Sequence, residues 1–89
     1  PDVLVHEQIH LIRQRKDHND WWERYIRDKQ FRFKEELLAY HAQYQFLEET
    51  TKDRNVLARL LFRLAKDLSG PMYGSVVVQS EARKLISMK

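Results

Sequence analysis

The sequence of 89 residues contains no cysteine and only two glycines and two prolines. Without cysteine the chain can form neither a disulfide nor a thiolate metal site. Its only glycines, Gly70 and Gly74, cannot build the glycine-rich loop that holds a nucleotide phosphate. No apolar run approaches the ~20 residues that span a bilayer, and the first residues lack the pattern of a secretory signal peptide. We therefore expect an intracellular domain without cofactor or membrane contact, in a compartment (cytoplasm or nucleus) that the sequence does not distinguish.

Charged residues make up 33% of the chain and hydrophobic residues 43%. This balance is typical of amphipathic helices with solvated outer faces, and the many aromatic residues argue against disorder. Residues 1–50 carry eight Lys/Arg against ten Asp/Glu, whereas residues 51–89 carry eight against three. The second half would thus favour an acidic partner or a phosphate backbone. We expect residues 1–89 to form a single helical domain that is a fragment of a longer protein.

Apolar periodicity predicts helices at about 3–17, 21–49, 52–68 and 75–87. Residues 21–49 contain eight of the ten aromatic residues and neither Pro nor Gly, so they are expected to form one long helix. Asp20 is the expected cap at its start. The last segment is ambiguous, because Val76, Val77 and Val78 also have strand propensity. The predicted fold is an all-α, small helical bundle of three to four helices built on one long central helix.

Short connections make consecutive helices antiparallel, so residues 3–17 are expected to pack along 21–36, and residues 52–68 along 34–49. Val5, Ile9 and Ile12 form the expected inner face of the first helix. The long helix has two apolar faces. One face, suited to its own neighbours, contains Trp22, Tyr25, Ile26, Phe33, Leu37, Tyr40, Tyr44 and Leu47. The other is a strip that the last helix, a second copy or a foreign protein could cover, and its predicted partner-binding residues are Trp21, Phe31, Leu38, Ala42 and Phe46.

Residues 6–10 have the sequence His-Glu-Gln-Ile-His, an H-E-x-x-H motif. On a helix the two histidines lie one turn apart and could bind zinc, with Glu7 as general base, so these five residues resemble those of zinc metalloproteases. The rest of the family pattern is missing. Arg13 and Lys16 stand where one form has Gly and His, and Lys29 and Gln30 stand where another form has a Glu ligand. We therefore expect His6 and His10 to be exposed or half-buried, with no catalytic, cofactor or metal site.

Other charged groups are interpreted as surface features. Glu35-Glu36 and Glu48-Glu49 are adjacent pairs, whose members point about 100° apart on a helix, so surface positions are expected. A basic stripe on the outer side of residues 52–68 is either a solvated helix face or, as the alternative, an anion-binding site for nucleic acid. This stripe contains Lys52, Arg59, Arg63 and Lys66.

The sequence thus favours a non-enzymatic module for protein–protein interaction or assembly that acts through helix–helix docking. The expected partner is another protein or a second copy of the chain, most simply in a dimer. The alternative is a nucleic-acid-associated helical domain that uses the basic stripe.

Overall fold

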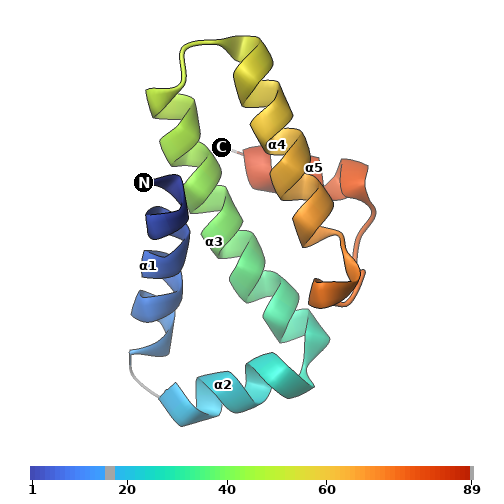
Figure 1. The fold of residues 1–89 in the computed structure, drawn as a ribbon. Helices are drawn as coiled ribbons and strands as arrows, with labels where there is room; N and C mark the ends of the chain where they lie inside the picture. The colour runs from blue at the N-terminus through green and yellow to red at the C-terminus, as the bar shows by residue number, and fades with distance from the viewer. Residues whose placement is uncertain (16–17, 89) are drawn as a thin grey trace.

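The computed structural model describes residues 1–15 and 18–88 and is all-helical over these ranges. These residues form five α-helices and one short 3₁₀-helix, and the long helix α3 is the central one on which the others pack (Figure 1). The fold class is therefore confirmed as all-α, but the count is five α-helices rather than three to four. Their bounds are α1 Asp2–Gln14, α2 His18–Arg27, α3 Lys29–Thr50, α4 Arg54–Leu68, η1 Pro71–Tyr73 and α5 Gln79–Ser87.

The long helix predicted at 21–49 is broken at Asp28. This residue has an extended backbone (φ −109°, ψ 103°), and its side chain accepts hydrogen bonds from the amides of Gln30 and Phe31 at the start of α3. An aspartate in this position satisfies amides that have no partner inside the helix. The guanidinium of Arg32 lies near the carbonyl oxygens of Tyr25 and Ile26 at the end of α2. Polar groups therefore cap both helix ends at the break, and the single predicted helix is two helices in the structure.

The other helix ends differ from the predictions by a few residues. The helix predicted at 3–17 ends at Gln14, and Lys16 and Asp17 lie outside the described residues. The helix predicted at 52–68 starts at Arg54, because Asp53 caps it through the amides of residues 55 and 56. The last segment is confirmed as a helix, although it begins only at Gln79, after the three valines.

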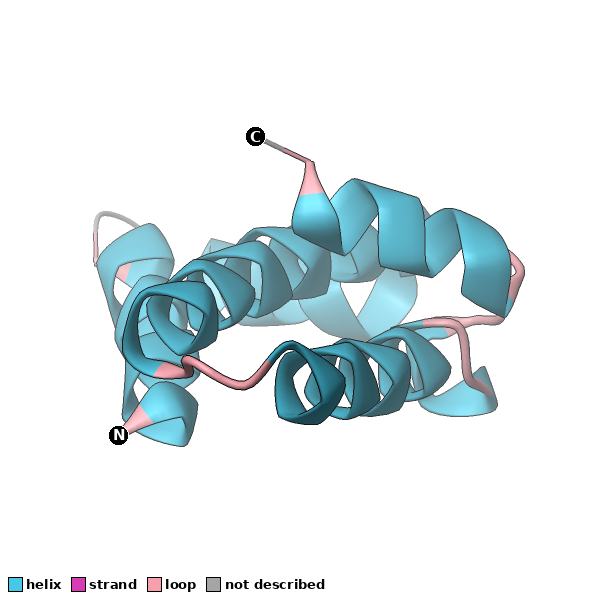
Figure 2. Cartoon of the chain, turned by 90° about the horizontal axis from the view of Figure 1, so that it is seen from above, coloured by secondary structure: helices cyan, strands magenta, loops and turns pink. Residues whose placement is uncertain are grey.

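The apolar core lies between α3, α4 and α5. Seen from above, these three helices enclose it while α1 lies on another side of α3 (Figure 2). Burial of such apolar side chains is the main stabilising contribution to a small domain. No helix of the described residues is long and apolar enough to cross a bilayer. The buried members of this core are Phe33, Tyr40, Tyr44, Leu47, Leu64, Ala65, Leu68, Ala82 and Ile86.

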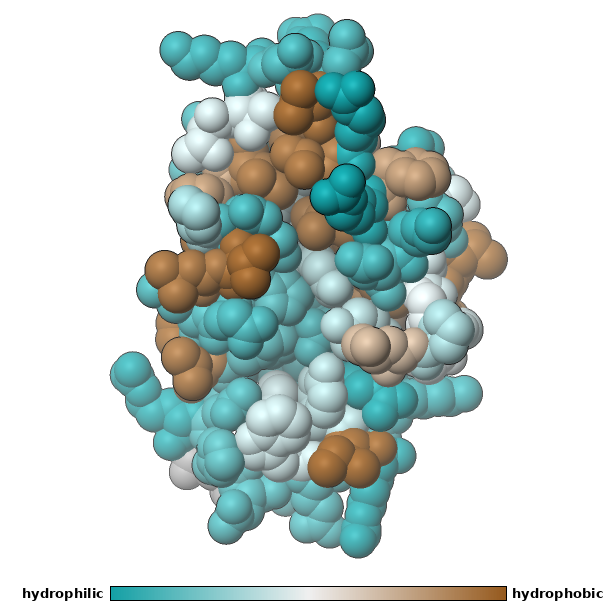
Figure 3. Space-filling view, viewed as in Figure 1, coloured by the Kyte–Doolittle hydropathy of each residue, from teal (hydrophilic) through white to brown (hydrophobic). Residues whose placement is uncertain are grey.

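Helix α1 packs against α3 with polar side chains, contrary to the prediction. Its buried residues are His6 and His10, whereas of the residues expected on the inner face Val5 and Ile9 are partly buried and Ile12 is exposed. Figure 3 shows hydrophobic side chains on the molecular surface over α1. Its four most exposed apolar residues, each 60–65% accessible, are Val3, Leu4, Leu11 and Ile12. The contacts of α1 with residues 35–43 also place it further along α3 than the expected register of 21–36.

Candidate metal centre

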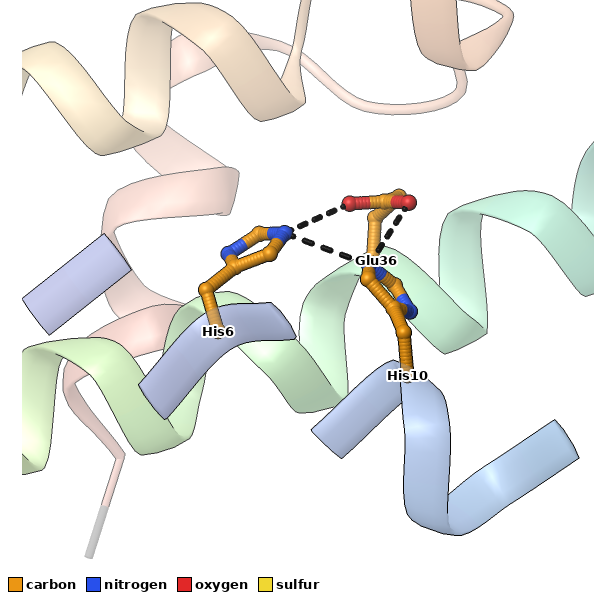
Figure 4. Close-up of side chains that lie close together, drawn as sticks. All are labelled: His6, His10 and Glu36. Carbon is orange, nitrogen blue, oxygen red and sulfur yellow. Dashed lines mark hydrogen bonds and ion pairs between the residues drawn. The ribbon is translucent and has the colours of Figure 1, made fainter. Parts of the chain in front are cut away.

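Three side chains from two helices converge in the interface between α1 and α3. The Nε2 atoms of His6 and His10 are 3.2 Å apart, and each lies 3.0 Å from one carboxylate oxygen of Glu36 (Figure 4). The two histidines share a face of α1 because they are four residues apart. Glu36 comes from α3, 30 residues beyond His6. All three side chains are buried, and their ligand atoms lie within 4.8 Å of one another. We refer to His6, His10 and Glu36 as the triad.

Hydrogen bonding determines which ring nitrogen of His6 carries the proton and which one faces the triad. Its Nδ1 lies 2.9 Å from Oε1 of Gln43, and the amide nitrogen of Gln43 donates to Asp2 at 2.7 Å. Because an amide oxygen can only accept, Nδ1 of His6 carries the proton. The Nε2 atom of a neutral His6 therefore presents a lone pair, yet it faces a carboxylate oxygen. Two lone pairs at this distance need a cation between them, either a proton or a metal ion.

The spacing of the triad suits a tetrahedral divalent ion. Zinc binds histidine nitrogen and carboxylate oxygen at about 2.0–2.1 Å, so neighbouring ligand atoms in a tetrahedron lie about 3.3 Å apart. The corresponding distances here are 3.0–3.2 Å. Two imidazoles and one carboxylate also form a ligand set of catalytic zinc sites, in which the fourth position stays open. The residues therefore fit zinc both in chemistry and in size.

The electrostatics of the triad favour a bound cation. Burial alone would raise the pKa of Glu36, but hydrogen bonds from His10, His6 and Tyr25 outweigh burial and lower this pKa to about 2. The Tyr25 hydroxyl donates to Oε2 of Glu36 at 2.5 Å. Burial would lower the pKa of His6, but its hydrogen bond to Glu36 and the charge of that carboxylate raise it above the ordinary value. Glu36 is thus a buried anion that attracts positive charge to the two imidazoles.

The neighbouring carboxylate, Glu35, anchors the helices that carry the triad. Its oxygens accept two hydrogen bonds from the Arg13 guanidinium, at 3.0 and 2.9 Å, and one from Nε1 of Trp21 at 2.8 Å. Burial would raise the pKa of Glu35, but these bonds and the Arg13 charge lower it below the ordinary value. The side chain of Glu35 is only 2% exposed. A single ionised carboxylate thereby ties α1 and α2 to α3.

Two cavities open beside the triad, and both are lined by His6, Glu7 and Tyr73. The cavity towards α2 has a volume of ≈ 250 Å³ and is further lined by His10, Gln14, Trp21, Trp22, Tyr25 and Glu36. The cavity towards α4 has a volume of ≈ 370 Å³ and is further lined by Asp2, Val3, Tyr40, Gln43, Leu47, Leu60, Arg63, Leu64 and Asp67. The triad and the exposed carboxylate Glu7 can therefore be reached by a small molecule or a peptide side chain.

The structure corrects the sequence-based expectations for this region. His6 and His10 are buried rather than exposed or half-buried, and Glu35 and Glu36 are buried rather than at the surface. The third ligand was expected, if anywhere, near Lys29 and Gln30, but those residues lie at the exposed start of α3. The signal that could have found Glu36 is the antiparallel pairing itself. That pairing brings residues 21–36 beside the first helix, and this range ends with the two adjacent glutamates Glu35 and Glu36.

The predicted partner-binding residues do not form one exposed strip in the structure. Trp21 is 7% exposed, stacks on Tyr25 with ring centroids 4.9 Å apart and donates to Glu35, so it belongs to the interior. Leu38 is 42% exposed, and the other three members, Phe31, Ala42 and Phe46, are partly buried. Helix α5 lies beside this region, where His41 Nδ1 is 2.8 Å from the carbonyl oxygen of Ile86. The last helix therefore covers the strip only in part.

The predicted anion-binding residues Lys52, Arg59, Arg63 and Lys66 are all exposed. Lys52 precedes the first residue of α4, whereas the other three lie within that helix. Arg63 also lines the larger cavity beside the triad, together with Asp2 and Asp67. The basic stripe is therefore a solvent-facing surface, one edge of which reaches the candidate metal centre.

Comparison with protein-family models, with curated proteins and with solved structures finds no match to this chain. The buried triad of His6, His10 and Glu36, with Glu7 and Tyr73 at its edge, is accordingly the feature of the molecule that bears most directly on function.

Proposed function

We propose that the protein is a zinc-dependent hydrolase whose metal ligands are His6, His10 and Glu36 and whose general base is Glu7. The observation that carries this proposal is the convergence of two Nε2 atoms and one carboxylate at 3.0–3.2 Å beside accessible cavities. An H-E-x-x-H helix supplies two ligands and a base in zinc metalloproteases, so an amide bond is the proposed substrate group. The proposal departs from the non-enzymatic module that the sequence favours.

In the proposed reaction a bound zinc ion would activate the water, and Glu7 would transfer its proton. Bound zinc supplies a Lewis acid and lowers the pKa of water. Glu7 follows His6 directly and lines both cavities, so its carboxylate can take a proton from the attacking water. As water oxygen bonds to the carbonyl carbon, the π electrons move to the carbonyl oxygen. When the C–N bond breaks, Glu7 returns the proton to the leaving nitrogen.

Metal binding is tested on protein purified without a histidine tag. We expect the wild-type chain to bind one Zn²⁺ or Co²⁺, and His6→Ala, His10→Ala and Glu36→Gln each to weaken binding strongly. The matched controls are His18→Ala on α2 and Glu49→Gln on α3, which change the same residue types outside the triad. Absence of stoichiometric metal in the wild type would refute the proposal.

Hydrolysis is tested separately with zinc-loaded protein and fluorescently labelled casein. Glu7→Gln keeps the three ligands, so it should bind zinc with unchanged affinity and lose at least a hundred-fold in cleavage rate. Equal cleavage rates for the wild type and Glu7→Gln would show that Glu7 is not the general base. Zinc binding without cleavage of casein would restrict the proposal to narrower substrates, to be sought with a peptide library.

A second candidate is the protein-interaction module that the sequence favours. It is supported by two cavities on α3 that share Leu37 and Leu38 and lie outside the metal centre. One is also lined by Phe31 and has a volume of ≈ 360 Å³, and the other, of ≈ 260 Å³, is also lined by Met88. Grooves with such apolar anchors suit a docking helix. A compact monomer in sedimentation at micromolar concentration would refute self-association, and Phe31→Asp/Phe46→Asp is the control for capture of a foreign partner.

The nucleic-acid alternative uses the exposed stripe of Lys52, Arg59, Arg63 and Lys66. Because phosphate contacts release counterions, binding through this stripe should weaken steeply as salt is raised. Arg59→Glu/Arg63→Glu should abolish it. Salt-sensitive binding that survives this double substitution, or no binding by the wild type, would exclude this alternative.

A further inference from the structure

Tyr73 is the aromatic residue that lies at the junction of the cavities around the metal centre. It lines the cavity towards α2, the cavity towards α4 and a third cavity of ≈ 420 Å³ beside the end of α4. Its side chain is half-buried, and burial together with the charges of Glu36 and Glu7 raises the pKa of its hydroxyl above the ordinary value. Tyr73 therefore borders the same space as a metal ligand and the proposed base.

The other two tyrosines near the triad, Tyr25 and Tyr40, make different contacts. Tyr25 donates its hydroxyl proton to Oε2 of Glu36, so that proton is already engaged in holding a ligand. Tyr40 packs the edge of its ring on His6, with centroids 4.5 Å apart, and lies 6.2 Å from the ring of Tyr73. Only Tyr73 lines the cavities on both sides of the triad. Its side chain thus borders the space on both sides of the triad.

The backbone around Tyr73 is fixed by a closed loop. The carbonyl oxygen of Gly70 accepts from the amides of Tyr73 and Ser75, at 3.2 and 3.1 Å. Gly74 (φ 83°) and Ser75 (φ 48°) are both in the left-handed region, which is costly for a serine. A side chain on Gly74 would also meet Cβ of Lys29 at 3.1 Å. The 3₁₀ turn therefore lies close against the start of α3, and backbone hydrogen bonds hold the main chain of Tyr73.

We propose that the Tyr73 hydroxyl donates a hydrogen bond to the carbonyl oxygen of the substrate as that oxygen takes up negative charge. This inference rests on the proposed hydrolase. In the addition step the water oxygen bonds to carbon, its proton passes to Glu7 and the carbonyl π electrons move to oxygen. Tyr73 keeps its proton and stabilises the resulting anion. Donors placed at such an oxygen contribute more in the transition state than in the ground state.

The experiment uses the Co²⁺-loaded chain of residues 1–89 with acetohydroxamate as an oxyanion probe, and visible absorption of the metal ion reports binding. Tyr73→Phe keeps the ring that packs beside Tyr40 but removes the hydroxyl. We expect unchanged Co²⁺ affinity and a ten- to hundred-fold weaker binding of acetohydroxamate, which is the range of a hydrogen bond to a charged group. Tyr44→Phe is the matched control, because Tyr44 is a buried tyrosine that lines neither cavity beside the triad.

The outcomes separate the two proposals. Equal acetohydroxamate affinity for Tyr73→Phe and the wild type, with Co²⁺ bound in both, overturns the role of Tyr73 and leaves the metal site intact. A wild-type chain that binds no Co²⁺ overturns the metal centre and the role of Tyr73 with it. Weaker acetohydroxamate binding in Tyr73→Phe and equally in Tyr44→Phe overturns the specific role, because a general loss of packing then accounts for both.

Discussion

Gln43 of α3 orients His6 of α1, because its amide oxygen lies 2.9 Å from Nδ1 of the histidine. The same amide donates to Asp2, so it cannot turn its nitrogen towards His6 without losing that bond. Groups of this kind hold a metal-binding imidazole in the tautomer that leaves Nε2 free. His10 differs, since no described residue hydrogen-bonds its buried Nδ1. The orientation of one of the two imidazoles thus depends on a neutral side chain that touches no metal.

Replacement of Gln43 by leucine should lower zinc affinity about 10–100-fold, the range for the loss of a partner that orients a metal ligand. Competition with a chelating zinc dye measures this effect. Gln45→Leu is the matched control, because Gln45 is an exposed glutamine on the same helix. Equal affinities for Gln43→Leu and the wild type would show that the orientation of His6 does not depend on Gln43.

Removal of the metal should loosen α1 more than any other helix. Among its residues, His6, His10 and Arg13 reach α3 through polar contacts, while several of its apolar residues face solvent. A ligand at a hundred times its Kd stabilises the folded state by about 2.7 kcal/mol. Hydrogen exchange with and without a chelator should therefore show faster exchange in residues 2–14, with residues 54–68 of α4 as the internal reference. Equal exchange rates with and without the chelator would show that the packing of α1 against α3 does not depend on metal binding.

Replacement of Glu35 by glutamine should destabilise the metal-free protein by about 1–3 kcal/mol near neutral pH, since a buried charged hydrogen bond to Arg13 is lost. The folded-state pKa of Glu35 is lowered, so its ionised form contributes stability above the ordinary carboxyl pKa. That contribution disappears as the pH falls below this value. Urea unfolding of both proteins from pH 7 to pH 3 should show a difference that shrinks with acid. A constant difference would contradict the role of the Glu35 charge.

Asp28 should be needed for the break between α2 and α3. Asp28→Ala removes the acceptor for the amides of Gln30 and Phe31 and should cost about 1 kcal/mol. Asp28→Asn is the control, because asparagine caps helices nearly as well as aspartate. Thermal unfolding compares the three proteins. If alanine and asparagine behave alike, the cap does not determine the break.

Much of the fold follows from the apolar pattern of the sequence. The spacing of Leu57, Leu61, Leu64 and Leu68 predicts α4, and its inner residues do lie in or against the core. The break at Asp28 escaped prediction because neither Pro nor Gly marks it, and one aspartate cap is a weak local signal. A helix can continue through aspartate at little cost. Contacts across the chain, such as Arg32 with the end of α2, decide between the two conformations.

The candidate metal centre could be predicted only in part from the sequence. The H-E-x-x-H motif identifies His6, Glu7 and His10, since their spacing lies within one helix turn. The expected antiparallel pairing brings Glu36 beside the first helix, but it does not tell which side chain of that range faces the two histidines. The apolar residues of α1 gave only part of its inner face, because Val5 and Ile9 are partly buried but Ile12 is exposed. Hydrophobic periodicity assumes that a helix buries its apolar side, whereas α1 instead buries the side that meets two ionised glutamates.

The ligand atoms of the triad are nitrogen and oxygen only, in a chain without any cysteine. Zinc sites built on thiolates lose their metal when sulfur is oxidised. Imidazole and carboxylate have no comparable oxidation, so a metal bound to His6, His10 and Glu36 is insensitive to the redox poise of its surroundings. Acid and chelators release it instead, because protons compete for the same lone pairs. The centre should therefore keep its ion equally well in oxidising solutions and in solutions of a reductant that does not chelate zinc.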